Sequence, residues 1–194
     1  MAMKVGIFLY DDAEVLDFSG PFEVFSTASR VAGSRLFETL LIAEREEVLA
    51  RGGFRVRPNC LTGHNPELDL LVVAGGDHRR ELANPSALQW IKSTAKSARI
   101  TASVCTGAFL LAEAGVLSSQ RVTTHWEDQA MLKSAYPALC VLEGVRWVDE
   151  GTIVTSGGIS AGIDMSLHLV RRLAGEELAR ATAKQMEFDW HSQG

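Results

Sequence analysis

The stretch Ile100-Thr101-Ala102-Ser103-Val104-Cys105-Thr106-Gly107-Ala108-Phe109-Leu110-Leu111-Ala112 decides the fold of this chain. Its first five residues form a run that predicts a buried strand, and the residues from Thr106 onward have a helical pattern. Cys105 stands at the junction, with Ser103 two residues before it and Gly107 two residues after it. Because small neighbours permit a tight turn, the stretch predicts a nucleophile elbow that presents Cys105 to a cleft.

The same alternation of strands and helices extends over the whole sequence. Further strands are predicted at Lys4–Leu9, Phe37–Ala43, Leu68–Ala74 and Thr152–Thr155. Helices are predicted at Pro21–Ser29, Pro85–Ser97, Thr106–Ala114, His125–Ala135, Ala161–Leu173 and Glu176–Met186, with each proline in a first helical turn. A hairpin is predicted for Arg146–Val148 and Ile153–Thr155. This order predicts one α/β domain over residues 1–194, with a mainly parallel sheet and helices on both faces.

The composition excludes several classes of protein. The net charge is −5 and no dense basic run occurs, so nucleic acid is not an expected partner. No apolar stretch approaches the roughly 18 residues of a membrane span, so no membrane partner is expected either. Three cysteines without a signal-peptide cleavage site favour reduced thiols and a cytoplasmic location. No His, Cys, Asp or Glu cluster has ligand spacing, so neither a metal nor a cofactor is predicted.

Three predicted strands end in turns of small residues. These turns are Ala74-Gly75-Gly76-Asp77, Ser103–Gly107 and Ser156-Gly157-Gly158. The carboxyl ends of parallel strands meet at one edge of a sheet, where ligands bind. An oxyanion site there could use the amides of Thr106 and Gly76, although Gly75-Gly76 is equally compatible with a plain turn.

The Cys105 thiol has two interpretations. The N-terminus of the following helix favours thiolate over thiol, which would make Cys105 reactive. Alternatively, Cys105 is a small buried hydrophobic residue, a frequent use of cysteine. Its position favours the reactive interpretation, whereas Cys60 and Cys140 lack this context and are predicted to be structural.

Asp17 and His125 are candidate partners of the thiol. Asp17 follows the first strand and could hold or relay a proton, although its spacing alone favours a capping or turn aspartate. His125 could act as a base, but Thr124 and Glu127 fit a capping box around it, which favours a structural role. Ser160 is likewise predicted to cap the helix that follows it.

Together these motifs resemble the ThiJ/PfpI superfamily, most closely its isocyanide (isonitrile) hydratase branch. The resemblance covers nearly the whole chain and rests on Leu16-Asp17-Phe18-Ser19-Gly20-Pro21, Ala74-Gly75-Gly76, Ser103–Gly107, Thr123-Thr124-His125-Trp126 and Gly157–Asp164. It implies a class I glutamine amidotransferase-like fold, that is, a flavodoxin-like three-layer α/β sandwich. It also implies a homodimer, in which Val15–Val24 could take part.

The resemblance assigns roles to individual residues. Cys105 corresponds to the nucleophile and Asp17 to the acidic residue beside it. Substrate-binding or oxyanion positions are implied for Gly75, Gly76, Thr106, Ile159 and His125. The implied activity is a cofactor-independent hydro-lyase that hydrates a small isocyanide to an N-substituted formamide. Thr106 stands where peptidase-like and chaperone-like members of the superfamily usually have histidine, which argues against their activities.

A second function is also compatible with the sequence. The chain resembles the N-terminal domain of AraC-type transcription regulators, which share its Cys-Thr-Gly and Thr-His-Trp patterns. Because the sequence ends at Gly194, a helix-turn-helix domain is not expected. Cys105 would then bind or sense a ligand or an oxidant, without turnover.

Overall fold

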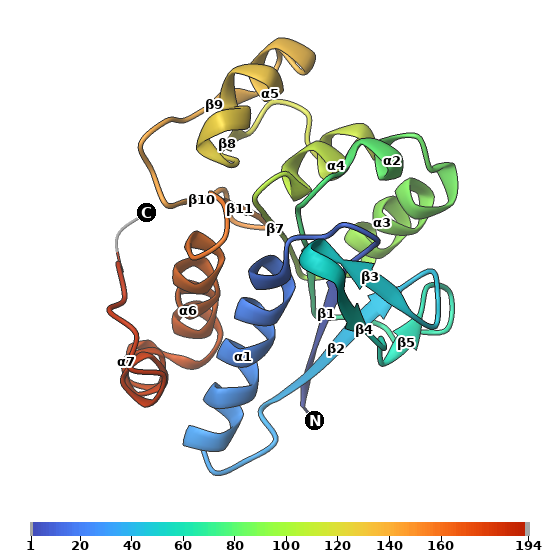
Figure 1. Cartoon of the computed structure of the whole chain (residues 1–194). Helices are drawn as coiled ribbons and strands as arrows, with labels where there is room; N and C mark the ends of the chain where they lie inside the picture. The colour runs from blue at the N-terminus through green and yellow to red at the C-terminus, as the bar shows by residue number, and fades with distance from the viewer. Residues whose placement is uncertain (1, 193–194) are drawn as a thin grey trace.

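A seven-stranded sheet forms the centre of the molecule in the computed structural model, which describes residues 2–192 (Figure 1). The strands have the order β10-β11-β7-β6-β1-β2-β5. Their bounds are β1 (Met3–Phe8), β2 (Phe37–Ala43), β5 (Cys60–Leu61), β6 (Leu70–Val73), β7 (Ile100–Val104), β10 (Trp147–Asp149) and β11 (Ile153–Ser156). Apart from the edge strands β5 and β10, this is the 2-1-3-4-5 order of flavodoxin-like sheets.

Helices cover both faces of this sheet. One layer contains α1 (Val15–Val31), α6 (Ala161–Ala174) and α7 (Glu176–Gln185), which pack on one another. Figure 1 shows the other layer on the opposite side, with α2 (Arg79–Leu82), α3 (Pro85–Ser97) and α4 (Gly107–Glu113). The predicted three-layer sandwich with a mainly parallel sheet is therefore confirmed.

The predicted hairpin is also confirmed, because β10 and β11 pair antiparallel, with Trp147 opposite Ser156. The sequence patterns did not predict several short elements. These are β3 (Val48–Ala50), β4 (Phe54–Val56), β8 (Arg121–Val122) and β9 (Cys140–Val141), the 3-10 turns η1 (Arg51–Gly53) and η2 (Trp126–Asp128), and helix α2. Helix α5 (Gln129–Ala135) follows η2 directly. Two to four residues are too few for a recognisable hydrophobic period.

The predicted start of the first helix at Pro21 is wrong. Helix α1 begins six residues earlier, at Val15, and Pro21 lies inside it. A proline in that position cannot donate the hydrogen bond that would end on the carbonyl group of Asp17. Burial of Asp17, Phe18, Gly20 and Pro21 against the rest of the chain holds the first turns in place despite this loss.

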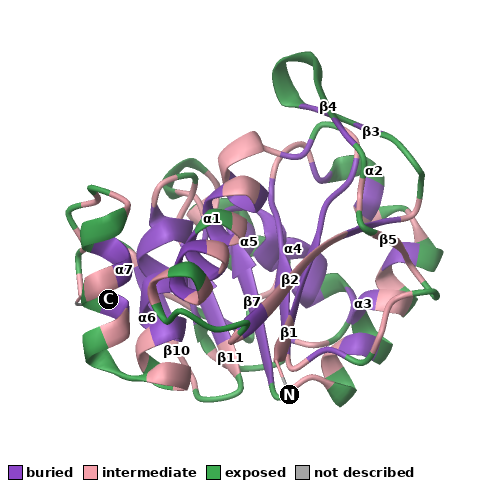
Figure 2. Ribbon diagram, turned by 90° about the horizontal axis from the view of Figure 1, so that it is seen from below, coloured by how far each residue is buried: buried purple, intermediate pink, exposed green. Residues whose placement is uncertain are grey.

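The core lies around the two central strands. Every residue of β6 and β7 is buried, and Figure 2 shows β7 as a purple ribbon. A Cβ atom added to Gly107 would collide with the carbonyl oxygen of Val73. The first turn of α4 can therefore approach β6 only because position 107 is glycine, and this contact sets the angle at which the chain leaves β7.

Within residues 2–192, none of the helices has both the length and the apolar character needed to cross a membrane.

Candidate functional site

Cys105 occupies the turn between β7 and α4. Its φ angle of 56° is in the left-handed region, which a non-glycine residue adopts only when its surroundings enforce it. The Cys105 amide donates to the carbonyl oxygens of Ser156 and Gly157, both at 3.2 Å. The Cys105 side chain is 7% exposed and lines a cavity of about 620 Å³. The thiol is thus held in a strained turn at the wall of a cavity large enough for a small molecule.

Asp17 lies beside this thiol, at the start of α1. Its side chain is fully buried, and its two oxygens accept hydrogen bonds from the amides of Gly75 and Ile159, each at 3.1 Å. The side chains of Asp17 and Cys105 are also close enough to influence each other's pKa. The structure therefore brings together four of the residues implied by the resemblance, from four separate segments of the chain.

Burial dominates the electrostatics of this pair. Burial raises the pKa of Asp17 to about 7, although the hydrogen bond from the Ile159 amide acts in the opposite direction. Burial, reinforced by the negative charge of Asp17, also raises the pKa of the Cys105 thiol. Near neutral pH the pair consequently holds one negative charge at most. The expectation that the helix N-terminus favours the thiolate is not met, because α4 is short and the loss of hydration outweighs its dipole.

Gly75 and Gly76 have structural reasons for being glycine. A Cβ atom on Gly75 would lie 2.6 Å from the Thr106 nitrogen and 2.8 Å from the Cys105 Cβ. Gly76 has a φ of 135°, and a Cβ atom there would lie 2.6 Å from the Ala13 Cα. The turn after β6 contacts both the Cys105 turn and the segment before α1. It can do so only because Gly75 and Gly76 have no side chains.

Two backbone amides, those of Gly76 and Thr106, are predicted to stabilise an oxyanion, and in the structure they differ in their availability. The Gly76 amide donates to Thr106 Oγ1 at 2.9 Å, and the Thr106 hydroxyl donates to the Gly76 carbonyl oxygen at 2.8 Å. Gly76 is thus already engaged and does not offer a free donor, which corrects the role expected for it. The amide of Thr106 instead faces the sulfur of Cys105. It is the donor best placed for charge that develops next to the thiol.

His125 borders the same cavity. A Cβ atom on Gly158 would lie 3.2 Å from His125 Cγ and 3.3 Å from Cys105 Sγ, so both side chains adjoin one glycine. The Nδ1 atom of His125 is 3.6 Å from Asp128 and 3.7 Å from Glu127. The structure therefore places His125 next to the thiol, as the resemblance implies.

The two predicted helix caps are wrong. The Thr124 hydroxyl donates to the carbonyl oxygen of Cys105 at 2.7 Å, and η2 starts after His125 without a side-chain cap. The Ser160 side chain does not cap α6 but accepts a hydrogen bond from Arg146 at 3.2 Å. Both hydroxyl groups meet distant partners that sequence spacing could not reveal.

Several lining residues were not predicted. His78 stacks on Phe109 with ring centroids 4.5 Å apart, and Met131 and Tyr136 complete the apolar wall. The position of His78, directly after the Gly-Gly turn at the end of β6, is the one signal that could have identified it. Among the described residues, no group of three or more His, Cys, Asp or Glu side chains is arranged to hold a metal ion.

Two known proteins are similar in sequence to this chain over nearly its whole length. The chain is 33% identical to isonitrile hydratase from Pseudomonas putida, over 97% of its own length and 79% of the relative. It is 27% identical to the HTH-type transcriptional regulator GbdR from Pseudomonas aeruginosa, over 96% of its own length and 51% of the regulator. The chain therefore spans about half the length of that regulator.

A solved structure supports the same fold. A ThiJ/PfpI family protein from Pseudomonas syringae superposes with a TM-score of 0.88 at 23% identity, covering 97% of this chain and 76% of the other. The profile of the DJ-1/PfpI family matches residues 3–172, which include the whole site. On the sequence match and the shared fold together, this chain belongs to the DJ-1/PfpI family.

Proposed function

We propose that the protein hydrates a small isocyanide to an N-substituted formamide, with Cys105 as the nucleophile. The observation that carries this proposal is the buried carboxyl group of Asp17 beside Cys105 at the wall of the 620 Å³ cavity. A neutral thiol beside a carboxyl group that titrates near pH 7 suits a reaction in which sulfur and a proton must both be added to one carbon. The 33% identity to an isonitrile hydratase supports the same choice.

In the first half of the reaction, the sulfur of Cys105 forms a bond to the terminal carbon of the isocyanide. The Asp17 carboxylate accepts the thiol proton and delivers it to that carbon, which yields a thioimidate. The Thr106 amide stabilises the negative charge that develops beside the sulfur. Because the proton passes between two neighbouring side chains, no charge needs to leave the buried site.

In the second half, water adds to the carbon of the thioimidate. Asp17 takes a proton from this water and passes it to the nitrogen, so that the carbon carries both a hydroxyl group and the sulfur. The carbon–sulfur bond then breaks, the hydroxyl proton returns to the sulfur, and the formamide leaves. One isocyanide and one water are consumed for each formamide, and both Cys105 and Asp17 regain their initial states.

The test follows the loss of absorbance of an aromatic isocyanide. Cys105→Ala is expected to abolish turnover, because no other thiol reaches the cavity, and Asp17→Asn is expected to lower kcat/KM by about 100-fold or more. In the unmodified protein kcat/KM should rise with pH through about 7, and this rise should vanish in Asp17→Asn. Cys140→Ala, which removes an exposed thiol, is the control. Full activity in Cys105→Ala would end the proposal.

A sensor function is the second candidate, because the match to the regulator GbdR covers 96% of this chain. In that case Cys105 would bind a ligand or be oxidised to sulfenic acid by a peroxide, which is itself reduced to water or an alcohol. Mass spectrometry of the peptide containing Cys105 after mild peroxide treatment measures this oxidation. Oxidation of Cys105 without turnover of any isocyanide would favour the sensor over the enzyme.

A further inference from the structure

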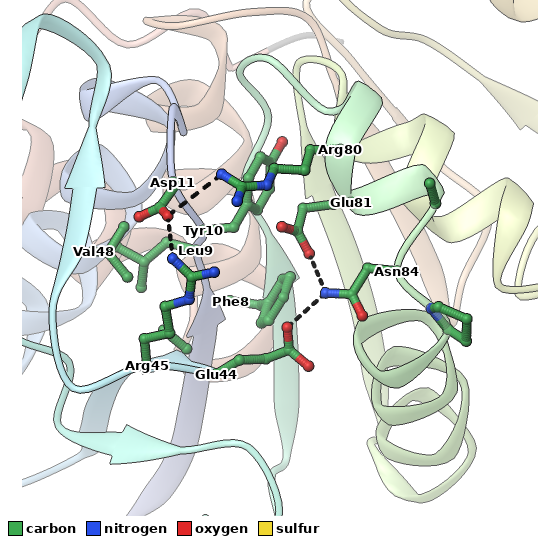
Figure 3. A pocket seen from close by; sticks show the side chains of 13 residues that line it. Phe8, Leu9, Tyr10, Asp11, Glu44, Arg45, Val48, Arg80, Glu81 and Asn84 are labelled. Atoms are coloured by element: carbon green, nitrogen blue, oxygen red, sulfur yellow. Dashed lines mark hydrogen bonds and ion pairs between the residues drawn. The ribbon is translucent and has the colours of Figure 1, made fainter.

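A second cavity, of about 280 Å³, lies at the carboxyl ends of β1 and β2 (Figure 3). It is lined by Phe8, Leu9, Tyr10, Asp11, Ala43, Glu44, Arg45, Val48, Arg80, Glu81, Ala83, Asn84 and Pro85. None of these residues lines the cavity of Cys105. This space, called here the β1–β2 cavity, is therefore separate from the site of the proposed reaction, and its volume is near the lower end of small-molecule sites.

One side of the β1–β2 cavity holds two carboxylates that share a single neutral partner. The side-chain amide of Asn84 donates to Glu44 at 2.6 Å and to Glu81 at 2.9 Å. Its orientation is fixed, because the Asn84 oxygen caps α3 by accepting from the amides of Ser86 and Ala87. Within residues 2–192, Glu44 and Glu81 form no ion pair with any cation of the chain.

In this environment it costs free energy for the two carboxylates to lack an ion-pair partner. Glu81 is 8% exposed, and burial, with Glu44 nearby, raises its pKa, although the hydrogen bond from Asn84 and the charge of Arg80 act in the opposite direction. The rings of Phe8 and Tyr10 line the space beside them. A cavity with aromatic walls and two carboxylates that lack a close ion-pair partner is complementary to an ammonium or guanidinium group.

The other side of the β1–β2 cavity has the opposite balance of charge. Arg45 lies 2.8 Å and Arg80 lies 3.9 Å from the same oxygen of Asp11, so two guanidinium groups share one carboxylate. Figure 3 shows Asp11 and Arg45 on one side of Phe8, and Glu81 and Asn84 on the other. The cavity is therefore bipolar, with two negative charges in excess on the Asn84 side and one positive charge in excess on the Asp11 side.

We propose that the β1–β2 cavity binds a small zwitterion, a molecule with a cationic amine or guanidinium group at one end and a carboxylate at the other. The cationic group would contact Glu44 and Glu81, and the carboxylate would contact Arg45 and Arg80. The apolar spacer would lie along Phe8, Leu9 and Val48. Each end of such a ligand supplies the charge that one side of the cavity lacks.

The test is calorimetric titration of the full chain with ε-aminocaproate and γ-guanidinobutyrate. Hexylamine and hexanoate each lack one of the two charged groups of ε-aminocaproate, and each is expected to bind at least about tenfold more weakly, since a hydrogen bond to a charged group contributes roughly 1.5–3 kcal/mol. Glu81→Gln should weaken binding of both zwitterions by at least about tenfold. Arg80→Gln should weaken binding of the zwitterions but leave that of hexylamine unchanged.

Two controls keep the outcome specific to this cavity. Glu47→Gln removes an exposed carboxylate that pairs with Arg55 outside the cavity, and it should bind as the unmodified protein does. Cys105→Ala should also retain binding, because the two cavities share no lining residue. The proposal is overturned if neither zwitterion gives a saturable titration, or if binding survives Glu81→Gln unchanged in a variant whose circular dichroism is that of the folded protein.

Discussion

At the scale of single residues, Asp17 is the most informative, because its carboxyl group both joins separate turns of the fold and lies beside the Cys105 thiol. The Gly75 amide comes from the turn after β6, the Ile159 amide from the turn before α6, and the Cys105 thiol from the turn after β7. A carboxyl group at this junction joins two of these turns by hydrogen bonds and adjoins the third. It is also buried enough for its ionisation to affect stability.

The stability of the protein should therefore depend on the ionisation of Asp17. Its pKa rises from 3.8 to about 7 on folding, so between these pH values the unfolded chain has released a proton that the folded protein keeps. Raising the pH through this window should lower the free energy of unfolding, by an amount on the order of 4 kcal/mol. Urea unfolding at a series of pH values measures this dependence.

Asp17→Asn supplies the matched comparison for this prediction. The asparagine cannot ionise, so the decline in stability between about pH 4 and pH 7 should become much smaller. Asp12→Asn, which removes an exposed carboxylate in the same segment, should keep the decline of the unmodified protein. An identical pH dependence in Asp17→Asn and the unmodified protein would show that Asp17 ionises in the folded state as it does in the unfolded one.

At the scale of elements, the angle between β7 and α4 depends on a contact made only by the backbone. A Cβ atom at position 107 would meet the Val73 carbonyl group, which is part of the sheet and cannot move aside. Gly107→Ala is therefore expected to destabilise the protein by about 1–3 kcal/mol in urea unfolding and to lower turnover by displacing Cys105.

Gly20→Ala is the control for this change. Gly20 is also a helical glycine, but its added Cβ would meet side chains and no backbone, with Ile163 at 3.0 Å and Leu16 at 3.7 Å. Relief from the poor helix propensity of glycine should offset that crowding, so stability should change by less than about 1 kcal/mol. Equal destabilisation by the two substitutions would contradict a specific role for the contact between Gly107 and Val73.

The same scale shows why sequence patterns predicted some elements and missed others. The strands β1, β2, β6 and β7 are long and apolar enough for periodicity and composition to identify them. Pro21 was a misleading signal, because packing against the core overrode its preference for a first helical turn. Thr124 and Ser160 fitted local capping rules, yet their hydroxyl groups bind a carbonyl 19 residues away and a guanidinium 14 residues away.

At the scale of the whole molecule, the site could be predicted only in part, because some of its contacts join residues that are far apart in the sequence. The position of Cys105 follows from its own neighbours, since a strand, a helix and small flanking residues define a tight turn. The bond between Asp17 and Ile159 spans 142 residues and leaves no local pattern. Asp17, Ile159 and His125 could therefore be placed at the site only through the family resemblance, and the β1–β2 cavity has no sequence signature.

The homodimer implied by the resemblance is the remaining prediction at this scale. Half of the segment Val15–Val24 is buried within the chain itself, so it offers less apolar surface than expected. The hairpin of β3 and β4 instead projects from the rest of the molecule in Figure 2, with Phe54 54% exposed and Leu49 46% exposed. Large exposed apolar side chains on a projecting element are typical of an interaction surface.

We expect light scattering to give twice the 21.1 kDa of one chain, and Phe54→Asp to reduce the mass to that of a monomer. The mass of a single chain for the unmodified protein at micromolar concentration would contradict the dimer, and an unchanged dimer in Phe54→Asp would exclude the hairpin from the interface.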